Sequence, residues 1–256
     1  MKINGFSLVE LSIVLVILGL LTGGILAGQS LIRAAELRGS IQELSSHTSA
    51  IYTFRDKYFA MPGDMTNATA FWGIAAGSTG ADTTCRLAAT TDGSTCDGDG
   101  DGQVSGATTG STYAQRNEYY RFWQHLANAG LIKGNYTGAI DAGGFERDVN
   151  VPSSRIDSSS FWMSVYSTAS AGNAFIFSQP AGNTLRITPT AYNGEECWNV
   201  DTKLDDGKPN TGKMMAYKGD PSALVTTRAN VAPPGDADAE YNLTLSDKIC
   251  NPWMYY

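Results

Sequence analysis

FSLVELSIVLVILGLLTGGILAG occupies residues 6–28 and decides the N-terminal architecture of the chain. The run is 23 residues long and contains a single charged side chain, Glu10. A helix of this length can cross a bilayer whose hydrocarbon core is roughly 30 Å thick. The segment is therefore predicted to be a membrane-spanning helix.

A cleavable secretory signal peptide is the alternative reading of this segment, because Lys2 supplies a short positively charged start. The apolar run is longer than the core of most signal peptides, and no clean small-x-small cleavage site follows it. Glu10 also lies where a carboxylate is costly in lipid. An acid inside a membrane span usually has a function.

The helical pattern continues beyond the span. Apolar residues recur at spacings of three and four as far as Tyr58, and Pro62 and Gly63 then end the pattern. One helix is thus predicted over residues 6–58, a rod of roughly 80 Å at 1.5 Å per residue. Its apolar half suits lipid or a filament core, and its amphipathic half suits packing on a globular domain formed by residues 59–256.

The N-terminus resembles that of type IV prepilins and type II secretion pseudopilins. MKING followed by FSLVELSIVLVILGLL has the short basic leader, the Gly5-Phe6 junction and the acid Glu10 of that family. The resemblance implies that a prepilin peptidase removes the leader, residues 1–5, and methylates the new amino group of Phe6. It also implies that Glu10 pairs with the positive N-terminus of a neighbouring subunit. Such a pair makes both charges tolerable in hydrocarbon and sets the axial register between subunits.

The same resemblance implies a structural subunit of a type IV pilus or pilus-like filament, and no enzyme. Its expected partners are other copies or related pilins, prepilin peptidase, an inner-membrane assembly platform and the lipid bilayer. The expected location is the bacterial inner membrane, crossed once with the C-terminal domain in the periplasm, and then an extracellular pilus or a periplasmic pseudopilus. Two alternatives stay open: a pseudopilin of a type II secretion system, and a membrane-tethered minor pilin or adhesin that binds a ligand.

Composition and motifs argue against two other classes of function. With a formal charge of -7 and scattered basic residues, the chain is not expected to bind nucleic acid. Nucleophile elbows, phosphate-binding loops and zinc-protease motifs are absent from the sequence, which has only two histidines. One of these, His125, is expected to be a surface or capping residue. The KLDDGK segment around Asp205 and Asp206 is expected to form a tight turn, with a metal site as the less favoured alternative.

The globular part is predicted to be α+β. A long Gly-rich surface loop should extend to about residue 115, followed by a short helix whose aromatic face, including Phe122 and Trp123, joins the core. Strand-like runs begin at Phe161, Ala174, Leu185 and Lys213, and the aromatic tail from Pro252 reads as a final strand. A long helix packed on an antiparallel sheet is the expected architecture. It is also the pilin-like roll that the resemblance implies.

Two disulfides are expected in an exported domain with four cysteines. Four cysteines permit three connectivities, and the sequence alone does not select one. We favour Cys85 to Cys96, which closes a small flexible loop, and Cys197 to Cys250, which ties the aromatic tail to the body.

CDGDGDGQVSGATT, residues 96–109, predicts a structural calcium site. Asp97, Asp99 and Asp101 alternate, Gly102 permits a sharp turn, and the carbonyl of Gln103 falls at a backbone-ligand position. Val104 follows where calcium loops of the helix-loop-helix type place an apolar anchor. Thr108 replaces the acid that would bind the ion through both oxygens, so Glu118 is proposed to complete the site. The alternative is a solvated acidic turn, although three unpaired carboxylates so close together would repel one another.

Overall fold

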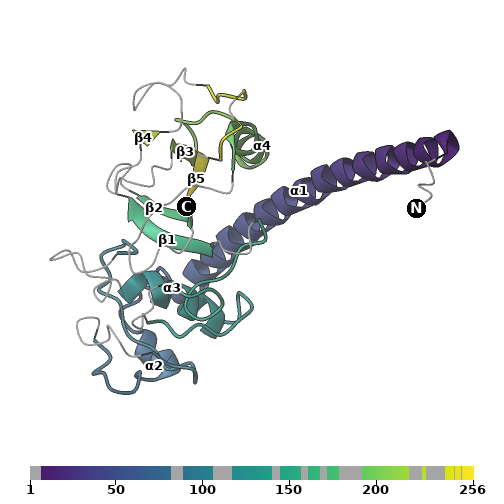
Figure 1. Cartoon of the computed structure of the whole chain (residues 1–256). Coiled ribbons are helices and arrows are strands. Elements are labelled where there is room, and N and C mark those ends of the chain that lie inside the picture. Colours follow the sequence, from purple (N-terminus) through teal and green to yellow (C-terminus); the bar gives the residue numbers. More distant parts are fainter. Residues whose placement is uncertain are drawn as a thin grey trace.

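The computed structural model of the protein describes residues 7–81, 89–105, 117–139, 145–156, 161–167, 172–178, 192–218, 227–228, 240–244, 246–248 and 250–256. These residues form a long helical rod and a globular body (Figure 1). The C-terminal half of the rod lies against the body, and its N-terminal half projects away from it (Figure 1). The predicted α+β architecture, a long helix with an antiparallel sheet, is confirmed.

Helix α1, Leu8–Tyr58, is the rod, and its 51 residues span about 77 Å at 1.5 Å per residue. It begins in a capping box, in which Ser7 Oγ accepts from Val9 N–H and Glu10 Oε2 accepts from Ser7 N–H at 2.8 Å. It ends at Phe59, which has a left-handed φ of 53° and donates its N–H to the carbonyl of Arg55 at 2.8 Å. The long helix predicted to end at Tyr58 is therefore confirmed.

The described strands form one antiparallel sheet in the order β1-β2-β5-β3-β4. At its centre, Met254 of β5 pairs with Phe175 of β2 on one side and with Met214 of β3 on the other. The strands predicted from Phe161, Ala174 and Lys213 and in the aromatic tail are confirmed, and the strand expected from Leu185 lies outside the described residues. The bounds are β1 Phe161–Ser167, β2 Gly172–Ser178, β3 Met214–Lys218, β4 Thr227–Arg228 and β5 Cys250–Tyr255.

Helix α3, Asn117–Asn128, joins the rod to the sheet. Trp123 of α3 meets His47 of α1 edge-on at 5.0 Å between ring centroids, and it stacks on Phe175 of β2 at 5.7 Å. The aromatic face of this helix therefore belongs to the core, as the sequence predicted. Buried hydrophobic side chains of the same core include Leu44, Ile51, Phe54, Phe122, Leu126, Phe177 and Met254.

Helix α4, Gly194–Leu204, was not predicted from the sequence. Its residue Cys197 forms a disulfide with Cys250 of β5, with 6.3 Å between their Cα atoms, and this confirms the predicted pair. Cys96 is also disulfide-bonded. Its predicted partner, Cys85, lies outside the described residues.

The Gly-rich segment after Pro62 is only partly the surface loop that was expected. It contains a short helix, α2, Ala68–Trp72, and the side chains of Met65 and Ala68 are buried in the core. Thr95 is buried as well, because its backbone exchanges hydrogen bonds with the segment after α2: Ala75 N–H donates to its carbonyl at 2.8 Å. These anchors come from distant parts of the chain, which a local periodicity does not reveal.

The expectation that His125 lies at the surface was wrong, because its side chain is fully buried. The segment 89–96 covers the side of α3 that lies away from the aromatic face. Thr95 Oγ1 lies 3.0 Å from His125 Nε2, and Gln124 Nε2 donates to Thr90 Oγ1 at 2.8 Å. Helix α3 is thus enclosed on both sides, which an amphipathic reading of its sequence does not predict.

Candidate functional site

The acidic loop, residues 97–105, is fastened to the turn that follows α1. Gly98 donates its N–H to the carbonyl of Met65 at 2.8 Å, and a Cβ at Gly98 would lie 2.4 Å from the Cα of Asp64. Only glycine allows this close approach of two backbones. The loop therefore meets Asp64, a residue more than thirty positions earlier in the chain.

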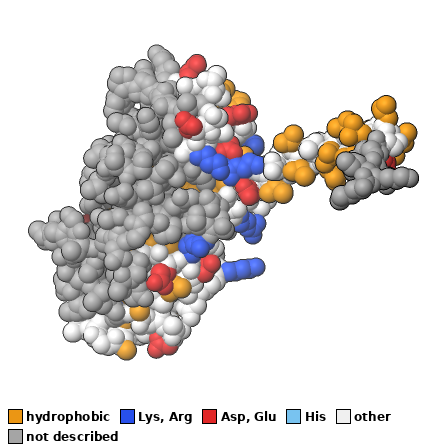
Figure 2. Space-filling view, in the orientation of Figure 1, with side chains coloured by type: hydrophobic (Ala, Val, Ile, Leu, Met, Phe, Trp, Pro, Cys, Tyr) orange, Lys and Arg blue, Asp and Glu red, His pale blue; other side chains and the backbone are white. Residues whose placement is uncertain are grey.

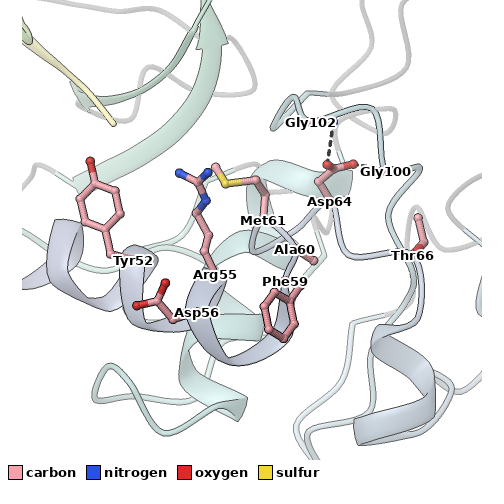
Figure 3. Close-up of a pocket in the computed structure, with 10 residues that line it drawn as sticks. All are labelled: Tyr52, Arg55, Asp56, Phe59, Ala60, Met61, Asp64, Thr66, Gly100 and Gly102. Carbon is pink, nitrogen blue, oxygen red and sulfur yellow. Dashed lines mark hydrogen bonds between the residues drawn. The ribbon is translucent and has the colours of Figure 1, made fainter.

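Asp64 joins Asp99 and Asp101 in a cluster of carboxylates. One oxygen from each of the three lies within 4.8 Å of the others. Asp64 is held in place because its Oδ1 accepts from Gly100 N–H at 2.6 Å. Its Oδ2 accepts from Gly102 N–H at 2.9 Å (Figure 3). Burial raises the pKa of Asp64 to about 6, and the charges of Asp101 and Asp99 add to the rise. An oxygen-only cluster of this kind suits a hard cation such as calcium.

Glu118, at the start of α3, supports the loop from beneath. Its side chain is buried, Oε2 accepts from Ser105 N–H at 2.7 Å, and Oε1 accepts from Asp99 N–H at 3.4 Å. Burial raises the pKa of Glu118 to about 9, and the charges of Asp64 and Asp99 act in the same direction. The carboxylate of Glu118, predicted to complete the calcium site, therefore lies close to the loop. It contacts backbone N–H groups and is not part of the cluster of Asp64, Asp99 and Asp101.

Asp97 points elsewhere. Its Oδ1 accepts from Thr69 N–H at 2.8 Å and its Oδ2 from the Thr69 hydroxyl at 3.0 Å, so it satisfies the first turn of α2. Val104 is buried, and its N–H donates to the side chain of Asn173 on β2 at 2.7 Å. The predicted apolar anchor thus lies in the core, while Asp64 stands where Asp97 had been expected. The sequence carries no local signal for Asp64, because its contacts to the loop are 36 and 38 residues distant.

A cavity of about 790 Å³ lies beside this cluster, at the end of α1. Asp64, Gly100 and Gly102 line one side of it, and Tyr52, Arg55 and Phe59 of α1 are among the residues on the other (Figure 3). The acidic loop and the last turns of the rod are therefore the two walls of one opening.

The second site is the projecting half of α1. Hydrophobic side chains cover it on every side that Figure 2 shows, and the large ones from Leu8 through Ile32 are at least half exposed. Among the described residues, α1 is the helix long and apolar enough to cross a membrane, and the most apolar stretch of it is not buried at all. The only acid in this half is Glu10, whose carboxylate caps its own helix. Gly5 and Phe6 lie outside the described residues.

The comparison with known families concerns this same segment. Residues 1–26 match the family described as the prokaryotic N-terminal methylation motif. The chain carries the type IV pilin and pseudopilin signature. Searches of curated proteins and of solved structures found no match.

The pilin signature accounts for the exposed apolar half of α1. It indicates a structural protein that a peptidase processes and that assembles into filaments with other pilins. The apolar half of α1 fits a membrane-anchored pilin, because side chains that contact nothing in the body need lipid or neighbouring helices around them.

The KLDDGK segment forms the expected turn directly after α4. Asp206 Oδ1 accepts from Lys208 N–H at 2.8 Å, and an Asp205 oxygen accepts from Met214 N–H at 2.8 Å. Asp201 lies close to both, and its Oδ2 accepts from the Tyr241 hydroxyl at 2.7 Å. Hydrogen bonds to backbone and hydroxyl donors thus account for these acids.

Proposed function

We propose that the protein is a structural subunit of a type IV pilus or pilus-like filament, and that it has no catalytic role. In this proposal prepilin peptidase cuts between Gly5 and Phe6 and methylates Phe6. The chain then crosses the bacterial inner membrane once, with its body in the periplasm, until an assembly platform moves it into a filament. The observation that carries the proposal is the projecting half of α1, which is apolar all round and bears one acid near its start.

Glu10 is the proposed assembly residue. Among the described residues of one chain, its carboxylate accepts one hydrogen bond, from Ser7 N–H at 2.8 Å, which leaves acceptor capacity for a second partner. The ammonium of Phe6 in a neighbouring subunit would neutralise it in an apolar filament core. A wrong stagger would leave both charges unpaired, so the pair would select one axial register.

A pseudopilin of a type II secretion system would use the same features, and a tethered minor pilin or adhesin is the third possibility. These three differ in where the assembled protein is found. Long filaments sheared from cells indicate a pilus, a short periplasmic assembly indicates a pseudopilus, and a few copies in filaments of another subunit indicate a minor pilin.

We also propose that the acidic loop binds a structural calcium ion. Asp64, Asp99 and Asp101 would supply carboxylate oxygens and the carbonyl of Gln103 would add a backbone ligand, while Glu118 would hold the loop in place through the N–H groups of Ser105 and Asp99. The support is the convergence of three carboxylates that repel one another without a cation. The ion would fix the loop to the end of α1 in a subunit exposed outside the cell.

Intact-mass analysis of protein taken from membranes and from filaments tests the main proposal. The expected mass is that of residues 6–256 with one added methyl group. A chain that begins at Met1 or near Gly28 would refute the pilin reading. In parallel, Glu10→Gln should stay in the membrane and lose most filament yield, with Ser12→Ala in the same span as the control. Filament yield equal to wild type in Glu10→Gln would remove the proposed role of this acid.

A further inference from the structure

Arg33 stands where the rod reaches the body. The described side chains of residues 7–27 are exposed, whereas the side chain of Arg33 is 23% exposed and donates hydrogen bonds to Glu196 and Ile156 of the body. The next residues along α1 pack more closely, and Gly39 and Ser40 are buried. The direction of the projecting half is therefore set by contacts at and after Arg33.

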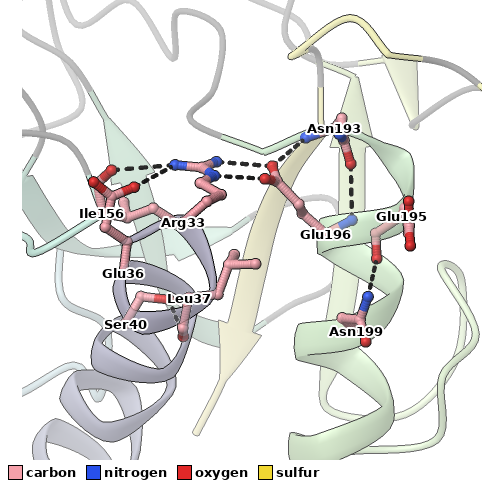
Figure 4. Close-up of polar contacts among 9 residues, drawn as sticks. All are labelled: Arg33, Glu36, Leu37, Ser40, Ile156, Asn193, Glu195, Glu196 and Asn199. Atoms are coloured by element: carbon pink, nitrogen blue, oxygen red, sulfur yellow. Dashed lines mark hydrogen bonds and ion pairs between the residues drawn. The ribbon is translucent and has the colours of Figure 1, made fainter. Parts of the chain in front are cut away.

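The principal contact is a two-bond fork to Glu196 of α4. Arg33 Nε donates to Glu196 Oε1 at 2.5 Å, and Nη2 donates to Oε2 at 2.8 Å (Figure 4). The remaining Nη1 donates to Glu36 at 3.0 Å and to the carbonyl of Ile156 at 3.3 Å. Two parallel bonds between planar groups fix orientation as well as distance, which a single bond does not.

Glu196 is itself held rigidly. Its Oε2 accepts from Asn193 N–H at 2.9 Å, while Asn193 Oδ1 accepts from Glu196 N–H at 2.9 Å, so it is half of the capping box of α4 (Figure 4). The next residue, Cys197, is bonded to Cys250 in the central strand β5. The fork therefore connects the rod to the middle of the sheet through groups that have little freedom to move.

Both partners stay charged in this place. Donating to the Glu196 carboxylate raises the pKa of Arg33 above its already high value. Burial acts to raise the pKa of Glu196, but the hydrogen bonds that it accepts from Arg33 and Asn193 keep that pKa below its usual range. Arg38, five residues further along α1, offers a comparison. Its side chain is exposed, and among the described residues no ion pair or hydrogen bond of Arg38 is found.

A small change of angle at this joint is magnified along the rod. Residues 8–32 extend about 38 Å, so a tilt of about 10° at Arg33 displaces the start of the helix by roughly 7 Å. That distance is larger than the reach of an ion pair. Glu10 would then miss a partner that it meets at the native angle.

We propose that Arg33 is a positioning residue: through its fork to Glu196 it fixes the angle between the apolar rod and the body, and so places Glu10 for assembly. The first part concerns the single chain, and the second rests on the proposed filament function.

The angle is measured in the full chain in detergent, by electron–electron distance measurements between spin labels at Leu18→Cys on the rod and Lys133→Cys on the body. Arg33→Gln and Glu196→Gln each break the fork, and the second keeps the capping box, because glutamine can serve at that position. Each should broaden the distance distribution at least about twofold, while the double variant is no broader than either single one, since both remove the same fork. Arg38→Gln should match wild type. A wild-type width in Arg33→Gln or in Glu196→Gln would overturn the proposal.

Filament yield tests the second part separately. If the wild-type protein forms filaments, Glu196→Gln should reduce the filament yield at least about tenfold, although the thermal melting of its body is unchanged. Broadened distances together with full assembly would restrict the role of the fork to the single chain. If the wild-type protein forms no filament, the filament proposal fails. The distance measurement then still tests whether the fork fixes the angle in the single chain.

Discussion

The imidazole Nδ1 of His125 accepts a hydrogen bond from the backbone N–H of Gly63, 3.0 Å away, inside the body. Because Nδ1 accepts this bond, the ring is neutral and carries its proton on Nε2. Nε2 faces Thr95 Oγ1 at 3.0 Å. Burial lowers the pKa of His125 to about 3, and the charge of Arg121 acts in the same direction. One neutral side chain thus ties the turn after α1 and the segment around Thr95 to α3.

His125→Ala should therefore destabilise the protein by about 3 kcal/mol, because it leaves a cavity and an unsatisfied buried N–H at Gly63. His125→Asn should cost less, since its Oδ1 can accept from Gly63, although the contact to Thr95 and the ring contacts with Phe54 and Trp72 are lost. Urea unfolding of the two variants in detergent measures the difference. Equal losses in both would show that the bond to Gly63 has little weight.

The calcium proposal separates Asp64 from Asp97. At a calcium concentration 100 times Kd, binding should stabilise the wild type by about 2.7 kcal/mol, seen as a rise in Tm. Asp64→Asn should abolish this rise, because it removes a convergent carboxylate. Asp97→Asn should keep the rise, since this side chain bonds to Thr69 and an asparagine oxygen can still accept there. The reverse result would favour the ligand set predicted from the sequence, which contains Asp97 and not Asp64. If calcium does not raise the Tm of the wild type, the calcium site is refuted.

Asp201 should make stability fall as pH increases. Burial raises its pKa to about 7, and nearby Asp206 and Asp205 contribute to the rise. In the unfolded chain the pKa is about 3.9, so the folded state binds the proton more tightly. Its stabilising effect is full below about pH 4 and is lost as pH rises through about 7.

Asp201→Asn should accordingly flatten the pH dependence of Tm between pH 5 and 8 relative to wild type. Asparagine preserves a polar partner for Tyr241 but does not titrate. The pKa values of Asp64 and Glu118 are also raised in the folded protein, so these groups also lower stability as pH rises. The difference in Tm between the variant and the wild type at each pH isolates the effect of Asp201. Parallel curves would contradict the assignment.

Phe59 should be replaceable with a gain in stability. Its φ is 53°, a conformation that costs a residue with a Cβ about 1 kcal/mol, and its side chain is 93% exposed. Phe59→Gly should therefore raise the free energy of unfolding by about 0.5 to 1 kcal/mol. Phe59→Ala, which keeps the Cβ, should show no comparable gain. A loss of stability in the glycine variant would indicate that the ring packs on something in solution.

The sequence predicted the elements whose pattern is local. The continuous apolar run and the three-four spacing beyond it predicted α1, and strand-like runs bounded by turn residues predicted the strands at Phe161 and Ala174. Helix α4 was missed although Asn193 and Glu196 form a capping box and Cys197, Val200 and Leu204 follow at helical spacing. The sequence analysis assigned a tight turn to the segment around Asp205 and Asp206 and predicted no element for the residues before it.

The candidate site was harder to predict because its contacts are long-range. The DGDGDG repeat marked the loop, but the roles of Asp64 and Asp97 depend on where Gly98 meets the turn after α1. His125 illustrates the same limit, since its partner Gly63 is 62 residues away. A pattern along one helix shows which side chains could be buried, and only the fold shows what covers the other side.

The position of β5 bears on how the body is made. It lies between β2 and β3, although it follows both in the chain. In the proposed topology the polypeptide leaves the cytoplasm in order, so β2 and β3 wait with unpaired facing edges until residues 250–256 have crossed. The bond between Cys197 and Cys250 can close only after that moment. During this interval the anchored α1 holds the incomplete body at the membrane surface, apart from the open periplasm where exposed strand edges would meet other chains.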